Sequence, residues 1–421
     1  MTELHAAVFA VGALVLGLGL LSGVLTRRLP LSTPLLALAA GVALGPAVLG
    51  LFDPAAWGSR ERILGETARL TLAIGLMATA LRLPPRYFLE RWRLQAVLLG
   101  LLMPVMCLVT ALLAYVWLGV PPLLALLLGA ILTPTDPIVA TSIVTGREAR
   151  RQLPARVRHA LSAESGANDG LAYAFVAVPI LLLTPGEHSF AGRWLTSALL
   201  REVCGGVLLG VASGLLAGRL FTLSERRGWM DDASFLAFTV ALALLVLGAA
   251  ELAHVNGVLA VFVAGLAFDN MAGGSERAEE ANVQEAVNQF FLLPIFALIG
   301  LVLPLEEWMA LGWRGAGFVV CVLLLRRLPA VLLLRPWLTP IARRHDALFI
   351  GWFGPIGVSA LLYSTVAIEH TGDELVWTVT SLAICASIVA HGVSATPFTQ
   401  AYAATRSRHS GGDGTSGAGD S

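Results

Sequence analysis

The chain has 421 residues, of which 57% are hydrophobic and 13% are charged, and its 28 basic and 28 acidic side chains balance to a formal net charge of zero. Because an ordinary soluble domain carries about 25% charged residues, this composition excludes a soluble globular enzyme and predicts a polytopic protein of the lipid bilayer. With zero net charge, the distribution of charge along the chain matters more than its sum, and we expect no nucleic-acid partner.

Thirteen apolar runs are long enough to cross a bilayer, which takes about 20 predominantly apolar residues in a helix. The first run is followed by Arg27 and Arg28 rather than by small residues of a cleavage site, so we interpret it as a retained span. The Gly/Ser-rich residues 402–421 predict a disordered cytoplasmic tail, which leaves residues 1–401 as one membrane domain. The predicted spans are approximately residues 5–25, 31–52, 63–82, 94–118, 121–145, 157–183, 196–220, 233–253, 255–270, 287–304, 311–334, 346–368 and 375–400.

The arginine positions support this span count, because cytoplasmic connections of membrane proteins carry an excess of basic residues. With an external N-terminus, the connections after odd-numbered spans face the cytoplasm, and these hold most of the arginines outside the spans. The opposite connections hold few, at Arg60, Arg62, Arg193 and Arg314. We therefore expect an external N-terminus and a cytoplasmic C-terminus in the plasma membrane or the inner membrane of the cell.

The third predicted span has an acid near its start, in Gly65-Glu66-Thr67-Ala68-Arg69. Glu66 could contribute to an ion site. Alternatively, it could pair with Arg69, three residues later on the same helix face, at the membrane interface.

The fifth predicted span is interrupted by Thr133-Pro134-Thr135-Asp136-Pro137. Pro134 and Pro137 flank a carboxylate and predict a break in the helix near mid-membrane, because proline removes a backbone donor and clashes with the preceding turn.

The twelfth predicted span has a matching interruption at Gly354-Pro355-Ile356-Gly357, followed by Ser359, which could face a site or pack. The two breaks lie in corresponding spans of two halves of opposite orientation. This arrangement predicts an all-α inverted repeat with two crossing discontinuous helices. The alternative is two proline kinks whose backbone groups are satisfied locally.

The sixth predicted span places an acid among small and apolar neighbours, where Asp169 follows Asn168. A carboxylate at mid-membrane depth costs at least about 2.5–3.5 kcal/mol and indicates a functional site. Burial favours its neutral forms, so Asp169 can hold either a proton or a monovalent cation, and this competition predicts exchange. We expect Na⁺ or Li⁺ to take oxygen ligands from Asp169, Ser165 and Thr135 or Thr133. Because Asn168 is uncharged, one titrating acid predicts one proton per cation.

Glu164 lies about 140° from Asp169 around the same helix, so we expect it to serve a different role. A buried acid needs a cation, and Arg326 and Arg327 stand in the middle of the apolar eleventh span. We predict an ion pair between Glu164 and Arg327. The alternative is that both arginines extend to the cytoplasmic interface.

Three classes of function fit buried acids in a membrane. Secondary transport of Na⁺, Li⁺ or K⁺ against H⁺ is favoured by the matched breaks. An intramembrane aspartyl hydrolase could use Asp136 and Asp169 as a dyad that shares a proton, and a cation channel would need a continuous pore. The four cysteines lie alone in apolar runs and no zinc motif occurs, so we expect no cofactor beyond the transported ions.

These motifs together resemble the monovalent cation:proton antiporter family. The similarity rests on Thr135-Asp136-Pro137, the run from Glu164 to Asp169 and an arginine in the eleventh span. The Asn168-Asp169 pair is similar to the electroneutral sodium/proton exchanger branch, which includes the NhaP-type antiporters. The resemblance implies a secondary transporter rather than an enzyme, with a role in pH homeostasis.

The resemblance also implies roles for single residues and for the spans. Asp169 would bind the cation and the proton, Ser165 would be a ligand, and Thr135 and Asp136 would belong to the crossover. Glu164 and Arg327 would pair, and Glu66 would contribute as in some members. The protein would be a homodimer with dimerisation spans near 5–52 and 196–270 and a core near 63–183 and 287–400 that moves like an elevator.

The twelfth span departs from the pattern. Gly354-Pro355-Ile356-Gly357 stands where many eukaryotic relatives carry Gly-Leu-Arg-Gly. The basic residue that would balance the half-helix dipoles there is therefore expected to be absent.

Overall fold

The computed structural model describes residues 9, 12–13, 16–17, 32–137, 139, 146–184, 189–229, 234–272, 292–341 and 343–412. Within these residues the regular elements are helices. They are α2 (Thr33–Leu44), η1 (Pro54–Trp57), α3 (Arg60–Leu81), α4 (Tyr87–Glu90), α5 (Trp92–Val97), η2 (Leu98–Leu102), α6 (Met103–Leu118), α7 (Pro122–Ile131), α9 (Gly146–Gln152), α10 (Ala155–Leu183), α11 (Phe190–Arg193), η3 (Trp194–Cys204), α12 (Gly205–Arg226), α13 (Ser234–Ala253), α14 (Gly257–Ala272), α16 (Leu305–Leu325), α17 (Leu328–Leu334), η4 (Arg335–Trp337), α18 (Arg344–Trp352), α19 (Val358–Thr371) and α20 (Leu375–Gly412). A further apolar helix covers Leu292–Leu301.

The predicted spans correspond to helices from the second span onward. Among the described residues, 7 helices are long and apolar enough to cross a membrane, and the shorter apolar helices include α2, α7 and Leu292–Leu301. The protein is thus a multi-pass membrane protein. The first predicted span, 5–25, lies almost wholly outside the described residues, so the count of thirteen stays a prediction.

Local signals in the sequence set several helix ends. The Ser59 hydroxyl accepts a hydrogen bond from the Arg62 N–H at 3.3 Å and caps the start of α3. Pro122 begins α7, where its missing N–H costs no helical hydrogen bond. Gly119 and Gly372, both with φ of 68°, end α6 and α19 in the left-handed conformation that glycine favours.

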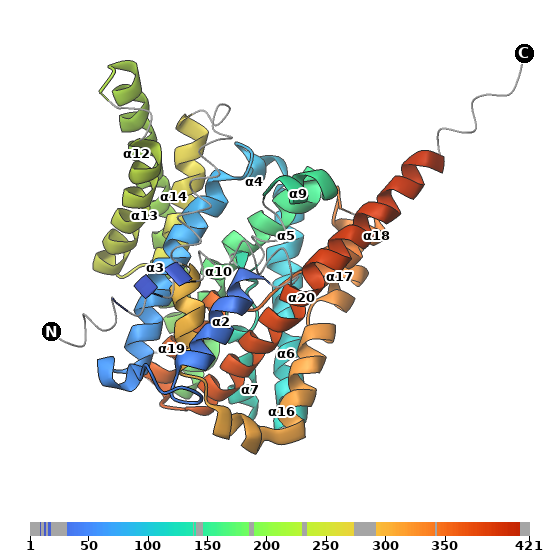
Figure 1. The fold of residues 1–421 in the computed structure, drawn as a ribbon. Coiled ribbons are helices and arrows are strands. Elements are labelled where there is room, and N and C mark those ends of the chain that lie inside the picture. Colours follow the sequence, from blue (N-terminus) through green and yellow to red (C-terminus); the bar gives the residue numbers. More distant parts are fainter. Residues whose placement is uncertain are drawn as a thin grey trace, which may run out of the picture.

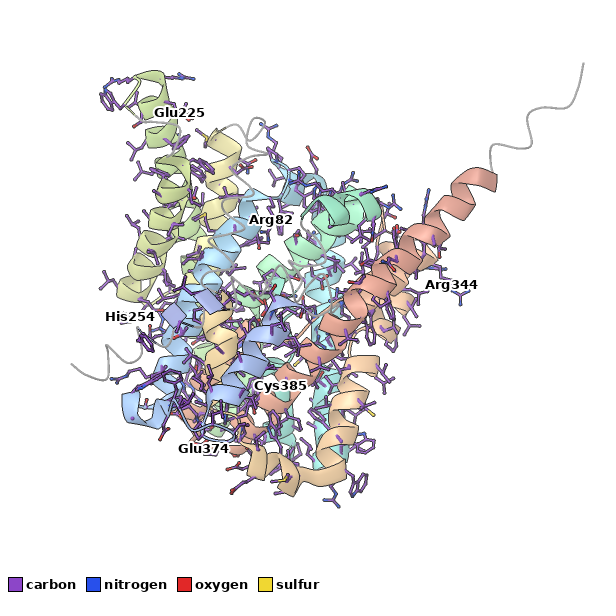
Figure 2. The ribbon with its side chains drawn as sticks, in the orientation of Figure 1. Arg82, Glu225, His254, Arg344, Glu374 and Cys385 are labelled. Atoms are coloured by element: carbon purple, nitrogen blue, oxygen red, sulfur yellow. The ribbon has the colours of Figure 1, made fainter. Side chains whose placement is uncertain are left out.

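The helices divide into two groups of neighbours. Figure 1 shows α12, α13 and α14 together at one side of the molecule, with α16, α17 and α18 at the opposite side. The helices α7, α10 and α19 pack against one another between these groups, and the largest buried apolar cluster surrounds them. Figure 2 places Glu225 at the upper end of the bundle and Glu374 at its lower end.

Closely spaced glycines join α12 to α14. A Cβ atom added at Gly210 would lie 2.5 Å from the Ala260 carbonyl oxygen, and one at Gly214 would lie 2.4 Å from that of Ala264. Gly218 continues the same face one turn later. Small residues at this spacing let two helix backbones approach closely in a membrane, where packing rather than the hydrophobic effect drives association.

The C-terminal helix is longer than the sequence analysis expected. The predicted disorder from residue 402 is wrong as far as Gly412, because α20 continues to that residue. Tyr402, at the start of the expected tail, is buried, and its hydroxyl donates to Asp346 Oδ1 at 2.5 Å, so this part of α20 is held against α18. Residues 413–421 lie outside the described residues.

We expect Gly214→Ala to lower the melting temperature in detergent, because the new methyl group overlaps the α14 backbone and overpacking costs about 1–3 kcal/mol. The matched control is Gly248→Ala in α13, where an added Cβ meets no atom within 4 Å. There the better helix propensity of alanine, about 0.8–1 kcal/mol, should leave the melting temperature unchanged or raised. Equal melting temperatures for the two variants would contradict the close packing of α12 on α14.

Candidate functional site

The two broken spans meet at their breaks. Residues 132–136 separate α7 from the helical turn at Pro137, and residues 353–357 separate α18 from α19. The backbone N–H of Asp136 donates to the carbonyl oxygen of Pro355 at 2.9 Å, which joins the two breaks directly. The crossing of two discontinuous helices that the sequence predicted is therefore present.

Asp136 binds the start of the helix that follows each break. Its Oδ2 accepts a hydrogen bond from the Val358 N–H at 2.5 Å, and its Oδ1 accepts one from the Val139 N–H at 3.3 Å. A carboxylate at a helix N-terminus balances the partial positive charge of the unpaired N–H groups. Gly357 is required here, because a Cβ atom at this position would lie 2.0 Å from Asp136 Oδ2.

Arg326 binds the opposite ends of the broken helices. Its guanidinium is buried and donates to the carbonyl oxygens of Leu132 and Gly354, which follow the C-terminal ends of α7 and α18. A cation there balances the partial negative charge of two helix C-termini. The expectation that the twelfth-span break lacks a balancing basic residue is therefore wrong, as is the interfacial alternative for Arg326. The residue comes from the end of α16, far from the break in sequence.

Glu164 and Arg327 form a buried, bidentate ion pair. The Arg327 nitrogens Nη1 and Nη2 donate to the two carboxylate oxygens at 2.5 and 2.7 Å, and both side chains are 3% exposed. Arg327 Nε also donates to the Ile350 carbonyl oxygen at 2.9 Å. The pair, which the sequence analysis expected between these two residues, links α10 to the α16–α17 junction and to α18.

Asn168 holds the fifth-span break against α10. Its Oδ1 accepts from the Thr135 N–H at 3.2 Å, and its Nδ2 donates to the Thr135 hydroxyl at 2.8 Å. That hydroxyl also lies 3.0 Å from the Ser165 hydroxyl, close enough for a hydrogen bond. All three predicted residues are buried and bound to one another.

Asp169 differs from every other acid of this cluster. It is fully buried, and neither carboxylate oxygen has a hydrogen-bond partner among the described residues. Its backbone carbonyl oxygen, in contrast, accepts a hydrogen bond from the Tyr363 hydroxyl. A buried carboxylate without donors is costly as an anion, so this group is stabilised by binding a proton or a cation.

A family model described as the transmembrane sodium/hydrogen exchanger matches residues 11–401. This chain belongs to the sodium/hydrogen exchanger family. A probable Na⁺/H⁺ antiporter of Schizosaccharomyces pombe is 34% identical to it, over 93% of this chain and 55% of that protein. Na⁺/H⁺ antiporter 2 of Zygosaccharomyces rouxii is 32% identical, over 94% of this chain and 52% of that protein. The chain thus spans about half the length of these curated relatives.

The fold of this exchanger-family chain matches a solved structure. The sodium proton antiporter MjNhaP1 of Methanocaldococcus jannaschii superimposes with a TM-score of 0.72, over 95% of this chain and 99% of that chain, at 18% identity. Together with the family model, this likeness confirms the family and the fold that the sequence motifs indicated.

Glu66 does not join the cluster in this exchanger-family chain. Its side chain is 64% exposed and lies 3.8 Å from Arg69, which in turn binds Glu251 at 2.8 Å. The structure therefore corresponds to the interfacial alternative rather than to an ion site. The cause is the rotation of α3, which turns Gly65 toward Thr365 instead.

Two polar residues near Asp169 were missed as site residues. Asn256, just before α14, donates through Nδ2 to the Gly170 carbonyl oxygen at 2.9 Å, and Tyr363 binds the Asp169 carbonyl oxygen. A polar cavity of about 290 Å³ is lined by both residues together with charged side chains that include Glu202 and Glu251. The available signal was their polarity next to long apolar runs, which in a membrane marks a path or a site.

Removing one partner of the Glu164–Arg327 pair should destabilise the protein by about 3–5 kcal/mol, because the other charge stays buried and unpaired. We expect Glu164→Gln and Arg327→Met to lower the melting temperature strongly, and the double variant to lose less than the sum of the two. A thermal double-mutant cycle measures this coupling. Additive losses would show that the two side chains act independently.

Arg326→Gln should loosen both breaks, because two helix C-termini lose their cation. We expect faster amide hydrogen exchange in peptides covering residues 128–136 and 350–358. Arg326→Lys should restore protection only in part, since an ammonium lacks the planar fork that reaches both carbonyls. Arg314→Gln, at an exposed position, is the control, and unchanged exchange in Arg326→Gln would contradict the assigned role.

Proposed function

We propose that this chain is a secondary antiporter that exchanges a monovalent cation, Na⁺ in the first place, for H⁺ at Asp169. The observation that carries the proposal is the fully buried Asp169 carboxylate, whose two oxygens have no hydrogen-bond partner among the described residues. The relatives from Schizosaccharomyces pombe and Zygosaccharomyces rouxii, named as a probable Na⁺/H⁺ antiporter and as Na⁺/H⁺ antiporter 2, support the same substrates.

The exchange follows from competition for one carboxylate. A proton or a cation neutralises Asp169, whereas the empty anion is costly in a dry environment. The loaded forms therefore cross between the two membrane faces more readily than the empty form, which couples the two fluxes. Asn168 adds no charge and Asp136 is committed to two backbone N–H groups, so one proton exchanges for one cation and the cycle is electroneutral.

The charged side chains at the crossover connect the helices around the site, so these helices can move together as one body. Asp136 and Arg326 hold both breaks, and the Glu164–Arg327 pair ties them to α10. We propose that this unit moves like an elevator against α12, α13 and α14 in a homodimer. The arginine distribution supports an external N-terminus and a cytoplasmic C-terminus, and the transported ions suffice without a cofactor.

Asp169→Asn should abolish cation-driven proton movement in proteoliposomes, because an amide can bind neither ion by charge. Acid-loaded vesicles would receive Na⁺, Li⁺ or K⁺, with the membrane potential clamped and then unclamped. Rates that do not depend on potential would support one-for-one exchange, and the most effective cation would identify the substrate. The control is Glu307→Gln, an acid at an exposed position of α16. Full exchange by Asp169→Asn would overturn the site.

A further inference from the structure

The hydroxyl of Ser359, like the Asp169 carboxylate, has no hydrogen-bond partner among the described residues. Ser359 is fully buried in the first turn of α19. Other hydroxyls of α19 are satisfied within that helix: Ser364 donates to the Leu361 carbonyl oxygen at 2.7 Å and Thr365 to that of Leu362 at 2.8 Å. A buried hydroxyl left without a partner is costly.

Ser359 lies on the face of α19 that packs against α10 at Asp169, because Tyr363, one turn later on that face, binds the Asp169 carbonyl oxygen. The Ser359 side chain interacts with Asp169, but Oγ and the two carboxylate oxygens do not meet hydrogen-bond geometry. Three buried oxygen atoms from α10 and α19 therefore lie near one another, and none of them has a hydrogen-bond partner within the described part of the chain. Hard cations bind such carboxylate and hydroxyl oxygens, each at about 2.3–2.6 Å for an ion of the size of Ca²⁺. Because of these distances, two oxygen atoms that bind the same ion lie farther apart than two oxygen atoms that share a hydrogen bond.

The hydroxyls predicted as ligands from the sequence are already engaged. Thr135 Oγ1 accepts from Asn168 Nδ2 at 2.8 Å and lies 3.0 Å from Ser165 Oγ. A cation that took both hydroxyls would have to break this network, whereas the Ser359 hydroxyl has no bond among the described residues to break.

We propose that Ser359 is a direct ligand of the transported cation together with Asp169, and that it contributes to the choice between Na⁺ and Li⁺. This inference rests on the proposed exchange at Asp169. The cation then bridges α10 and α19. Ser359 directly follows Val358, whose N–H is held by Asp136 at 2.5 Å, so the crossover fixes the position of this ligand.

Three variants test the assignment. Ser359→Ala removes the hydroxyl, Ser359→Thr keeps it, and Ser364→Ala removes a buried hydroxyl of the same helix that bonds its own backbone. The measurements are the half-saturating Na⁺ and Li⁺ concentrations for exchange in proteoliposomes, and the rise of melting temperature with Na⁺ or Li⁺ in detergent. The second readout reports binding without transport, because a ligand of the folded state stabilises it in proportion to its affinity.

For Ser359→Ala we expect the half-saturating Na⁺ concentration to rise about tenfold, which corresponds to about 1.4 kcal/mol, with a smaller change in maximal rate. The Li⁺ value should change by a different factor, and the melting curves should shift to higher cation concentration in parallel. Ser359→Thr and Ser364→Ala should stay near the wild type in both measurements.

Unchanged cation affinity and selectivity in Ser359→Ala would overturn the ligand assignment, as would an equal loss in Ser364→Ala. The proposed function fails in a distinguishable way. If Asp169→Asn still exchanges ions, the site at Asp169 is wrong, whatever the serine variants do.

Discussion

The structure depends on balancing four half-helix ends inside the membrane. Each broken span leaves unpaired N–H groups on one side of its break and unpaired C=O groups on the other, and no bulk water is available there to satisfy them. Asp136 takes the N-terminal ends and Arg326 the C-terminal ends, and each side chain binds both spans. Two opposite charges thus stabilise the crossing, and both are used to bind backbone groups.

This constraint explains why the buried charged residues have different binding partners. Asp136 and Arg326 are committed to backbone, and Glu164 and Arg327 are committed to each other. Asn168 is bound to Thr135 through both atoms of its amide. Of the acids of this cluster, Asp169 is the one whose two carboxylate oxygens have no hydrogen-bond partner in the part of the chain that the structure describes. Charged and amide side chains that are held by their own partners, around one carboxylate that is not, form the arrangement that a reversible ion site needs. Binding then changes the charge of one group and leaves these side chains in place.

The helices around the site are closely packed against one another. The α12–α14 contact is made through glycines whose neighbours lie too close for any side chain. The contact between α10 and α14 near the site is equally close, because a Cβ atom added at Gly170 would lie 2.5 Å from Leu259 Cβ. Asn256, just before α14, also donates to the Gly170 carbonyl oxygen. A polar cavity reaches the same place from the side of Glu202 and Glu251. The site thus lies where one closely packed group of helices meets another that carries the crossover.

The amino-acid sequence alone is enough to predict the membrane class, the two breaks and the acid at the site. Long apolar runs, prolines within a span and a carboxylate among apolar residues are local features of the sequence. Each has a large energetic consequence in a membrane, so each can be recognised without a structure. The sequence also paired Glu164 with Arg327, because a buried acid requires a cation. It could not decide which helix supplies the charge for the twelfth-span break, since Arg326 reaches Gly354 only through tertiary packing. Nor could the sequence show which polar side chains face the site. The rotation of α3 exposes Glu66, whereas the rotation of α19 turns Ser359 toward Asp169. The rotation of a helix within a bundle is set by all of its neighbours together, and no short stretch of sequence contains that information.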